Sequence, residues 1–494
     1  MKEDQITLFA EQKLPDKPLS LHEAMARALK YNLDLRQKNM EEALSRKQGE
    51  VTELEMLPRL VTSAGYSSRS PEDASISKSV LSGSVSKEAS VSSDAISKNG
   101  DLTLSWNWLD FGVSYFQTRQ DGNKALVQHE YRRKAAHNLI RDVRFAFWKA
   151  TAAQSLENNL NAIRKESEQA LEEARTAEQE GLRSPTYSLQ FQLGMMETMR
   201  QIEKSLAELS QSREELALLI HLPPGTPYQL RDDSNTMMTS LGASVTPETL
   251  EQIALSSRPE LLIERYQGRI EADETRKAIA RLFPGLEFNL SKNYDSNSYL
   301  VNQHWAQVGA RLSWNLLRTF TGQSQLDLSK ERENVVRTRR LVAHMAVLSQ
   351  TRIAYQEYRT SEKMLHRAII ESAIRQRMQN HAADRSALGL ESQLSYVHAA
   401  AAYLLGRIQQ YEAYARYQSA LGHLYATLGL DPLQDGSEHE EIDQLVRHLQ
   451  ENESRWQQMI FPGAKPTSSS GKETNANQSV TNLLEDYVGS TEFR

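Results

Sequence analysis

The tetrapeptide LSWN occurs twice in this chain, at residues 104–107 and again at residues 312–315. Around each copy apolar and polar residues alternate, which is the period of a β-strand. Each strand has an apolar face, formed by Leu102, Leu104, Trp106 and Trp108 in the first and by Ala306, Val308, Ala310, Leu312, Trp314 and Leu316 in the second. Such strands occur in soluble sheets and in membrane barrels that are apolar outside and wet inside. The rest of the chain must decide between the two.

The composition favours long helices over one large globular core. Of the 494 residues, 39% are hydrophobic and 25% are charged, and glycine and proline are few for this length. The net charge of -6 gives no electrostatic reason to expect nucleic acid binding. Because cysteine is absent, a disulfide scaffold, a thiolate metal site and a lipidated N-terminal cysteine are excluded for the chain as given.

No run of about 18 apolar residues is present, so any membrane crossing must use strands and not a helix. Residues 1–18 form a polar leader. This leader lacks the apolar run and the small-residue cleavage site of a secretion signal, so we expect no signal peptide in the given chain.

Residues 19–230 are predicted to form one structural repeat. Two helices, the second ended by Pro58, precede a strand. The serine-rich segment at 67–100 separates this strand from the LSWN strand and is expected to be an exposed loop, or a loop into which the flanking strands extend with frayed ends. The remaining predicted ranges are strands at 59–66 and 101–109, a long helix at 113–180, a tip at 181–185 and a return helix at 186–221. The long helix would extend roughly 100 Å. Its apolar residues recur every three or four positions, so it requires helical partners.

After a polar linker at 231–246, residues 247–432 repeat the same plan. The predicted ranges are strands at 285–292 and 305–316, a long helix at 322–388, a tip at 389–391 and a return helix at 391–428. Pro58 aligns with Pro284 at an offset of about 226, and Gly181 aligns with Gly389 at an offset of about 208. These ungapped matches indicate an internal duplication. Residues 433–461 are predicted to be a peripheral segment, and residues 462–494 a disordered tail.

Four strands do not close a barrel, and open strand edges are not tolerated in a bilayer. Known membrane barrels have at least about eight strands, which two or more copies of this chain would supply. The sequence therefore predicts a mainly helical oligomer, with long antiparallel coiled-coil helices and a shared membrane barrel.

At this point the chain resembles the outer membrane efflux protein family, the TolC-like exit ducts of Gram-negative bacteria. The resemblance covers about residues 19–432. It rests on the order and duplication of LSLHEAMARALKYNLDLR, MLPRL, LFPGL, the two LSWN strands, EQEGLRSP, RSALGLES and LYATLGLDP. It implies a trimer with a twelve-stranded barrel in the bacterial outer membrane and a helical tunnel, or α-barrel, across the periplasm, where residues 433–461 would lie. It also implies a periplasmic adaptor (membrane fusion) protein and an inner-membrane transporter as partners.

The family places its adaptor contacts around the tip glycines, and the matching positions here are Gly181, Ser184, Pro185, Leu388 and Gly389. Some members narrow the tunnel with aspartate rings on the second return helix, where this chain has Ser395 and His398. Asp384 or Glu391 would then supply a displaced acidic ring, which would favour cations. The alternative is that these are solvated charges near a helix end. Trp106, Trp108 and Trp314 are expected to face lipid.

No catalytic signature is present: HExxH, GxSxG, GxGxxG and P-loop motifs are missing, and the two S-x-x-K matches lie in the serine-rich loop. The twelve histidines are dispersed. We therefore expect no enzyme, no cofactor and no metal site. The leading hypothesis is a passive trimeric exit duct for efflux or type I secretion. The alternative is a non-channel structural coiled-coil protein of the cell envelope.

Overall fold

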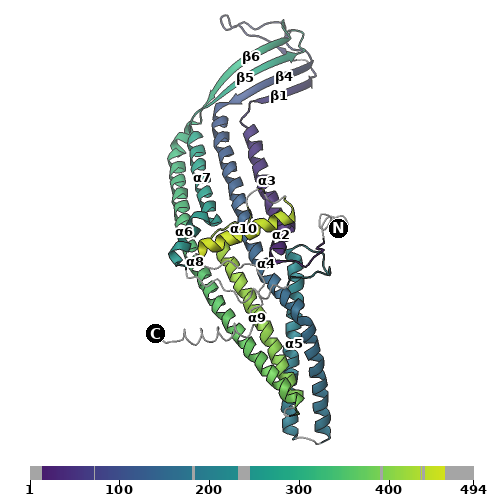
Figure 1. Ribbon diagram of the computed structural model, residues 1–494. Helices are drawn as coiled ribbons and strands as arrows, with labels where there is room; N and C mark the ends of the chain where they lie inside the picture. Colours follow the sequence, from purple (N-terminus) through teal and green to yellow (C-terminus); the bar gives the residue numbers. More distant parts are fainter. Residues whose placement is uncertain are drawn as a thin grey trace. The chain divides into compact units, whose positions relative to one another are not determined.

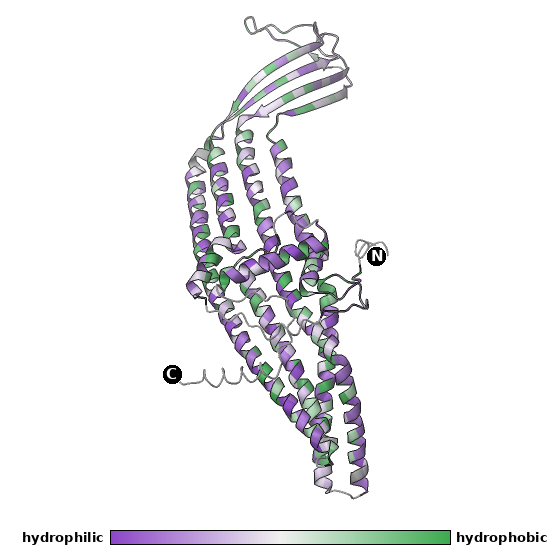
Figure 2. Ribbon diagram, viewed as in Figure 1, coloured by the Kyte–Doolittle hydropathy of each residue, from purple (hydrophilic) through white to green (hydrophobic). Residues whose placement is uncertain are grey.

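Figure 1 shows the computed structural model, which describes residues 14–71, 73–180, 184–231, 245–389, 393–433, 436 and 440–461. The tail predicted at 462–494, most of the predicted linker and most of the predicted leader lie outside the described residues. Hydrophilic and hydrophobic residues are interspersed along the helices (Figure 2). In the described part of the chain, no helix combines the length and hydrophobicity that a membrane span requires.

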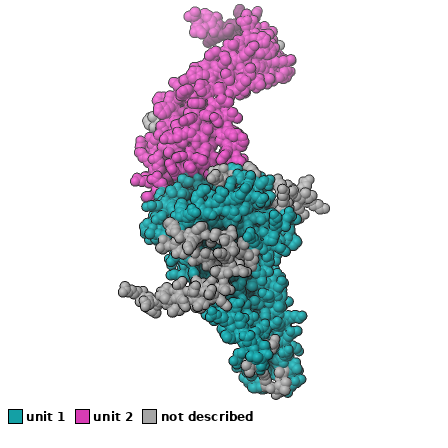
Figure 3. Space-filling view, viewed as in Figure 1, with its two compact units in different colours: residues 1–40, 130–262, 342–494 teal, residues 41–129, 263–341 magenta. Residues whose placement is uncertain are grey.

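The chain divides into two compact units (Figure 3). The first contains residues 1–40, 130–262 and 342–494, and the second contains residues 41–129 and 263–341. Among the described residues, five helices lie within the first unit: α2 (Leu21–Tyr31), α5 (Pro185–Leu219), α6 (Pro247–Ser257), α9 (Gln393–Thr427) and α10 (Ile442–Ile460). Four helices have residues in both units: α3 (Leu33–Leu54), α4 (Trp108–Gln179), α7 (Pro259–Ala280) and α8 (Leu316–Ala387).

Corresponding helices of the two halves have equal lengths. The lengths are 11 residues for α2 and α6, 22 for α3 and α7, 72 for α4 and α8, and 35 for α5 and α9.

The second unit contains a four-stranded antiparallel sheet in the order β1-β4-β5-β6. The strands are β1 (Arg59–Ser68), β4 (Ile96–Asn107), β5 (Gly285–Asp295) and β6 (His304–Ser313). The register places Trp106 opposite Phe288 and Leu290 opposite Val308, so the apolar residues of neighbouring strands share one face. Among the described residues, β1 and β6 each have an edge without a partner strand.

The serine-rich segment is shorter as a loop than the predicted 67–100. β1 continues to Ser68, β4 begins at Ile96, and the two-residue strands β2 (Ala74–Ser75) and β3 (Ser90–Val91) pair between them. The flanking strands therefore extend into this segment, which is the alternative that the sequence left open, because backbone pairing does not require apolar side chains.

The junctions between strand and helix lie earlier than predicted. Trp108 is the first residue of α4 and Leu316 the first of α8, so neither belongs to a strand. The Asn107 Oδ1 accepts hydrogen bonds from the backbone N–H groups of Leu109 at 3.0 Å and Asp110 at 3.4 Å. Asn107 therefore caps the helix, which begins directly after the motif. The prediction that Trp108 lies on a strand is wrong for this reason. The same prediction is wrong for Trp314, because β6 ends at Ser313.

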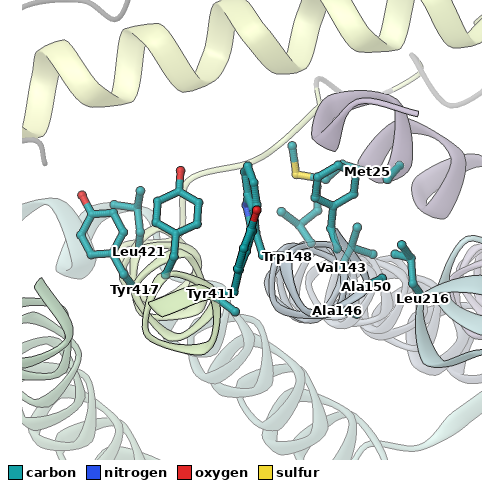
Figure 4. Packing of buried hydrophobic residues seen from close by; sticks show 14 of the residues in the cluster. Met25, Val143, Ala146, Trp148, Ala150, Leu216, Tyr411, Tyr417 and Leu421 are labelled. Atoms are coloured by element: carbon teal, nitrogen blue, oxygen red, sulfur yellow. The ribbon is translucent and has the colours of Figure 1, made fainter. Parts of the chain in front are cut away.

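The core of the first unit lies where α4 meets α9, with contributions from α2 and α5. Figure 4 shows Val143, Trp148 and Ala150 of α4 near Tyr411 of α9 and Met25 of α2. The Trp148 ring packs edge-on against Tyr414, with 4.6 Å between centroids. Each large side chain that is fully buried in this way contributes about 1.5–3 kcal/mol.

Candidate functional site

The sheet of the second unit leaves its apolar face exposed. Only its two central strands, β4 and β5, have a partly covered polar face, because β1 and nearly all of β6 are exposed on both faces. On β4, Leu102 and Leu104 are 47% and 39% exposed, whereas the intervening Thr103 is half-buried. On β5, Phe288 and Leu290 are exposed in the same way. A sheet in a soluble protein packs its apolar face on a core and exposes its polar face to water. In this sheet the exposure of the two faces is reversed. It is the pattern of a sheet whose apolar side meets lipid.

The three tryptophans predicted to face lipid lie where the strands meet the helices. The Trp106 ring contacts the rings of Trp108 and Phe111 edge-on, each with 5.8 Å between centroids, and is half-buried by them. Trp108 is 58% exposed, and Trp314, one residue beyond β6, is 53% exposed. The Trp314 Nε1 donates to the Leu282 carbonyl at 3.2 Å. An exposed indole with a bonded N–H suits a membrane–water interface.

The first tip lies partly outside the described residues, and Gly181 is among those not described. Ser184 is the N-cap residue of α5 and Pro185 is the first residue of the helix, where its missing N–H has no cost. Across the tip, the Gln192 Nε2 of α5 donates to the Glu178 Oε2 of α4 at 2.6 Å. The described part of this tip is therefore a close helical hairpin.

The second tip ends α8 on a left-handed glycine. Gly389 has a φ of +69°, and its N–H donates to the Ser386 carbonyl at 3.0 Å. This is the conformation that glycine adopts at a helix C-terminus at little cost. The neighbouring Leu388 is 73% exposed, so the tip presents an apolar side chain to its surroundings.

The described residues that are predicted to constrict a tunnel lie on α8 and α9, on either side of the second tip. Asp384 is exposed on α8, Ser395 and His398 are exposed on α9, and Glu391 lies outside the described residues. His398 faces α5, because a Cβ atom at Gly194 would lie 3.8 Å from its Nε2. Among the described residues, no three histidine or carboxylate side chains are arranged to hold a metal ion.

Sequence reasoning missed a buried charge network that joins α10 to α2 and α4 within the first unit. The Glu453 carboxylate of α10 contacts the Arg144 Nη2 of α4 at 2.7 Å and the His22 Nε2 of α2 at 2.9 Å. Burial alone would raise the pKa of Glu453, but Arg144 and His22 outweigh it and lower this pKa to about 2. The only signal in the sequence was an arginine inside the apolar stripe that contains Val143 and Phe147.

A second missed network fixes the C-terminal end of α9. Arg133 donates to both carboxylate oxygens of Asp431, at 2.9 and 2.8 Å, and the His137 Nε2 lies 3.0 Å from the same carboxylate. Gly429 has a φ of +71°, and a Cβ atom there would lie 2.6 Å from the Ser257 carbonyl oxygen. Only glycine permits this approach between the end of α9 and the end of α6.

Comparisons with known proteins agree with this architecture. Residues 24–220 match the model of the family described as outer membrane efflux protein. The Campylobacter jejuni CmeC outer membrane channel aligns with a TM-score of 0.64 at 14% identity, covering 87% of this chain and 89% of that chain. The open state of the Neisseria gonorrhoeae MtrE outer membrane channel aligns with a TM-score of 0.63 at 18% identity, covering 83% and 88%.

The outer membrane protein VceC from Vibrio cholerae aligns with a TM-score of 0.59 at 13% identity, covering 83% of this chain and 96% of that chain. No curated protein sequence matches this chain significantly. The resemblance drawn from the sequence is confirmed: the chain has the fold of these channels, and its residues 24–220 match the model of the outer membrane efflux protein family.

Proposed function

We propose that this protein is an outer-membrane exit duct, which passively conducts substrates delivered by a pump and an adaptor in a tripartite efflux or type I secretion system. The observation that carries the proposal is the reversed sheet, with its apolar face exposed and two strand edges without partners among the described residues. The family match of residues 24–220 and the fold of solved outer-membrane channels support it.

In this proposal three copies pair their free β1 and β6 edges to form one twelve-stranded barrel. Each copy contributes the four strands β1, β4, β5 and β6. A closed barrel removes every edge and satisfies the backbone groups, which a bilayer requires. The equal helix lengths of the two halves support an internal duplication, in which each half supplies one strand hairpin and one long helical hairpin to the wall.

The proposed partners are a periplasmic adaptor at the helical tips and an inner-membrane transporter behind it. The exposed Leu388 beside Gly389 is a suitable contact for a helical adaptor hairpin, because an apolar side chain at a glycine-ended tip is accessible to a partner. A narrowing of the tunnel at Asp384, Ser395 or His398 belongs to the same proposal.

Two neighbouring residues of β6 allow a matched test of the barrel. Val308 is 81% exposed on the apolar face, and Gln307 stands on the polar face next to it. Val308→Arg places a charge toward lipid near the middle of the strand, which costs about 2–4 kcal/mol in each protomer. Gln307→Arg places the same charge toward water and is expected to cost little.

The experiment is expression in the outer membrane, measurement of oligomer mass in nanodiscs, and conductance in planar bilayers. Wild type and Gln307→Arg are expected to form conducting trimers, while Val308→Arg fails to assemble. Equal assembly of the two variants would contradict the assignment of the faces. A monomeric wild-type protein without conductance would favour the alternative, a structural coiled-coil protein.

A further inference from the structure

Two adjoining pockets lie in the first unit, between α4, the joint of α6 and α7, α8 and α9. One measures about 280 Å³ and the other about 560 Å³, and both are lined by Arg141 and His423. Sharing these two residues makes them one groove. Together they fall in the size range of small-molecule sites, which is about 300–1,000 Å³.

The smaller pocket is the cationic end of this groove. Its lining includes Lys134, Arg141 and Arg258 against a single carboxylate, Glu260. Lys134 and Arg258 both pair with Glu260, at 3.1 and 2.9 Å. Arg141 is compensated by Asp142, at 2.8 Å, so Lys134 and Arg258 against Glu260 leave one positive charge in the pocket without counting histidine. The first residue of α7, Pro259, also lines it, so the positive end of that helix dipole adds to the field.

One hydrogen-bond donor group of Arg258 has no acceptor among the described residues. It is 8% exposed, its Nε donates to Glu260, and its Nη2 donates to the Gln350 side chain. Its Nη1 has no hydrogen-bond partner in the described part of the chain. A buried guanidinium donor without a partner is costly, and an oxyanion is the partner that fits its planar geometry.

The larger pocket is the apolar end. Phe145 of α4 and Met364 of α8 line it with Ala413 and Ala420 of α9, and Met364 is 52% exposed. Two carboxylates also line it, and each faces a basic side chain: Glu357 lies 2.9 Å from His423, and Glu412 lies 4.0 Å from Arg416. Methionine and phenylalanine together make an adaptable surface for rings and chains. The groove thus has an apolar floor at one end and unsatisfied positive charge at the other.

We propose that this groove binds an organic anion with an apolar body. The carboxylate of the ligand lies at Lys134 and Arg258, and its apolar body contacts Phe145 and Met364. This site goes beyond the proposed duct, because binding is measured without conduction and does not depend on it.

The test uses the full-length protein in lipid nanodiscs and isothermal titration with three probes: 2-naphthoate, 2-naphthalenemethanol and inorganic phosphate. Wild type is expected to bind 2-naphthoate saturably, and the alcohol and phosphate at least about tenfold more weakly. Arg258→Gln and Lys134→Gln are each expected to weaken naphthoate binding about tenfold. Lys134 is 47% exposed, so its variant tests the charge without disturbing a buried side chain.

Arg200→Gln is the matched control, since Arg200 is 76% exposed on α5 and does not line the groove. It is expected to bind naphthoate as wild type does. Equal binding of the alcohol and naphthoate would show an apolar pocket only, and equal binding of phosphate and naphthoate would show a simple oxyanion site. Either result, or no saturable binding, overturns the proposal.

Discussion

Replacing Glu453 by glutamine is expected to loosen α10 from the rest of the first unit. The substitution keeps the size of the side chain and removes its charge. Arg144, whose side chain is 2% exposed, would then be left without its carboxylate partner in the core. Removing one member of a buried ion pair typically costs about 3–5 kcal/mol.

The pKa of Glu453 gives a second value for the free energy that this ion pair contributes to folding. It falls from 4.5 to about 2, because Arg144 and His22 outweigh the effect of burial. A shift of this size corresponds to about 3 kcal/mol in favour of the folded state at neutral pH. Because the folded pKa is the lower one, this contribution is complete above the unfolded pKa and is lost as the pH falls from about 4.5 toward 2.

Hydrogen exchange of the α10 amides measures the loss directly, because this helix can open without global unfolding. We expect exchange in Ile442–Ile460 to accelerate on the order of a hundredfold in Glu453→Gln at neutral pH. Trp456 provides a second readout, since its ring packs on Tyr425 with 5.3 Å between centroids. Its fluorescence is expected to change between pH 4.5 and pH 2 in wild type and to lose this transition in the variant.

Two control proteins make the reasoning refutable. Glu451→Gln changes an exposed carboxylate on the same helix and is expected to leave exchange unaltered. The double variant Arg144→Met with Glu453→Leu removes both charges and is expected to recover much of the lost stability. If Glu453→Gln behaves like Glu451→Gln, the buried pair contributes nothing and the argument fails.

Three further changes test other parts of the structure. Asn107→Ala removes the cap of α4 and is expected to cost about 1 kcal/mol, seen as faster hydrogen exchange at Leu109 and Asp110. Gly429→Ala is expected to lower the melting temperature, since a left-handed non-glycine residue costs about 1–2 kcal/mol before its clash with Ser257 is counted. Leu388→Cys adds the first thiol to a chain without cysteine. In the proposed duct, opening requires the tips to move apart, so crosslinking these thiols between protomers is expected to block transport but leave the proposed trimer intact. Unchanged transport would contradict this mode of opening.

The elements that follow from local patterns were predictable from the sequence. Alternation marked all four strands of the sheet, because a side-chain period of two is read from adjacent residues. Glycine and proline at the tips marked the ends of the long helices for the same reason. The cap at Asn107 was also local, but its strand-like surroundings concealed it. Asn107 is the last residue of β4 and at the same time caps α4, which begins at the next residue.

The buried networks and the groove were not predictable, because their partners are distant in the sequence. Glu453 lies in a segment that reads as a polar amphipathic helix, and nothing in that pattern indicates Arg144 as its partner. Arg258 precedes a helix-starting proline and reads as an exposed cap residue, yet it is 8% exposed. Burial of a charge depends on which helices pack together, and periodicity alone does not specify this.

A comparison of the two halves shows why the proposed duplication does not predict these contacts. At the two offsets of the proposed duplication, Arg144 corresponds to Arg352 at about 208, and His22 corresponds to Glu248 at about 226. Arg352 has its side chain 60% exposed and contacts Glu248 at 3.7 Å, so the second half supplies the acid from the equivalent short helix. The first half has histidine there and takes its acid from α10, which occurs once in the described chain. The arginines at these equivalent positions therefore differ: Arg352 is a surface charge, whereas Arg144 is buried and bound to α10. The difference arises from α10, a helix outside the proposed duplication.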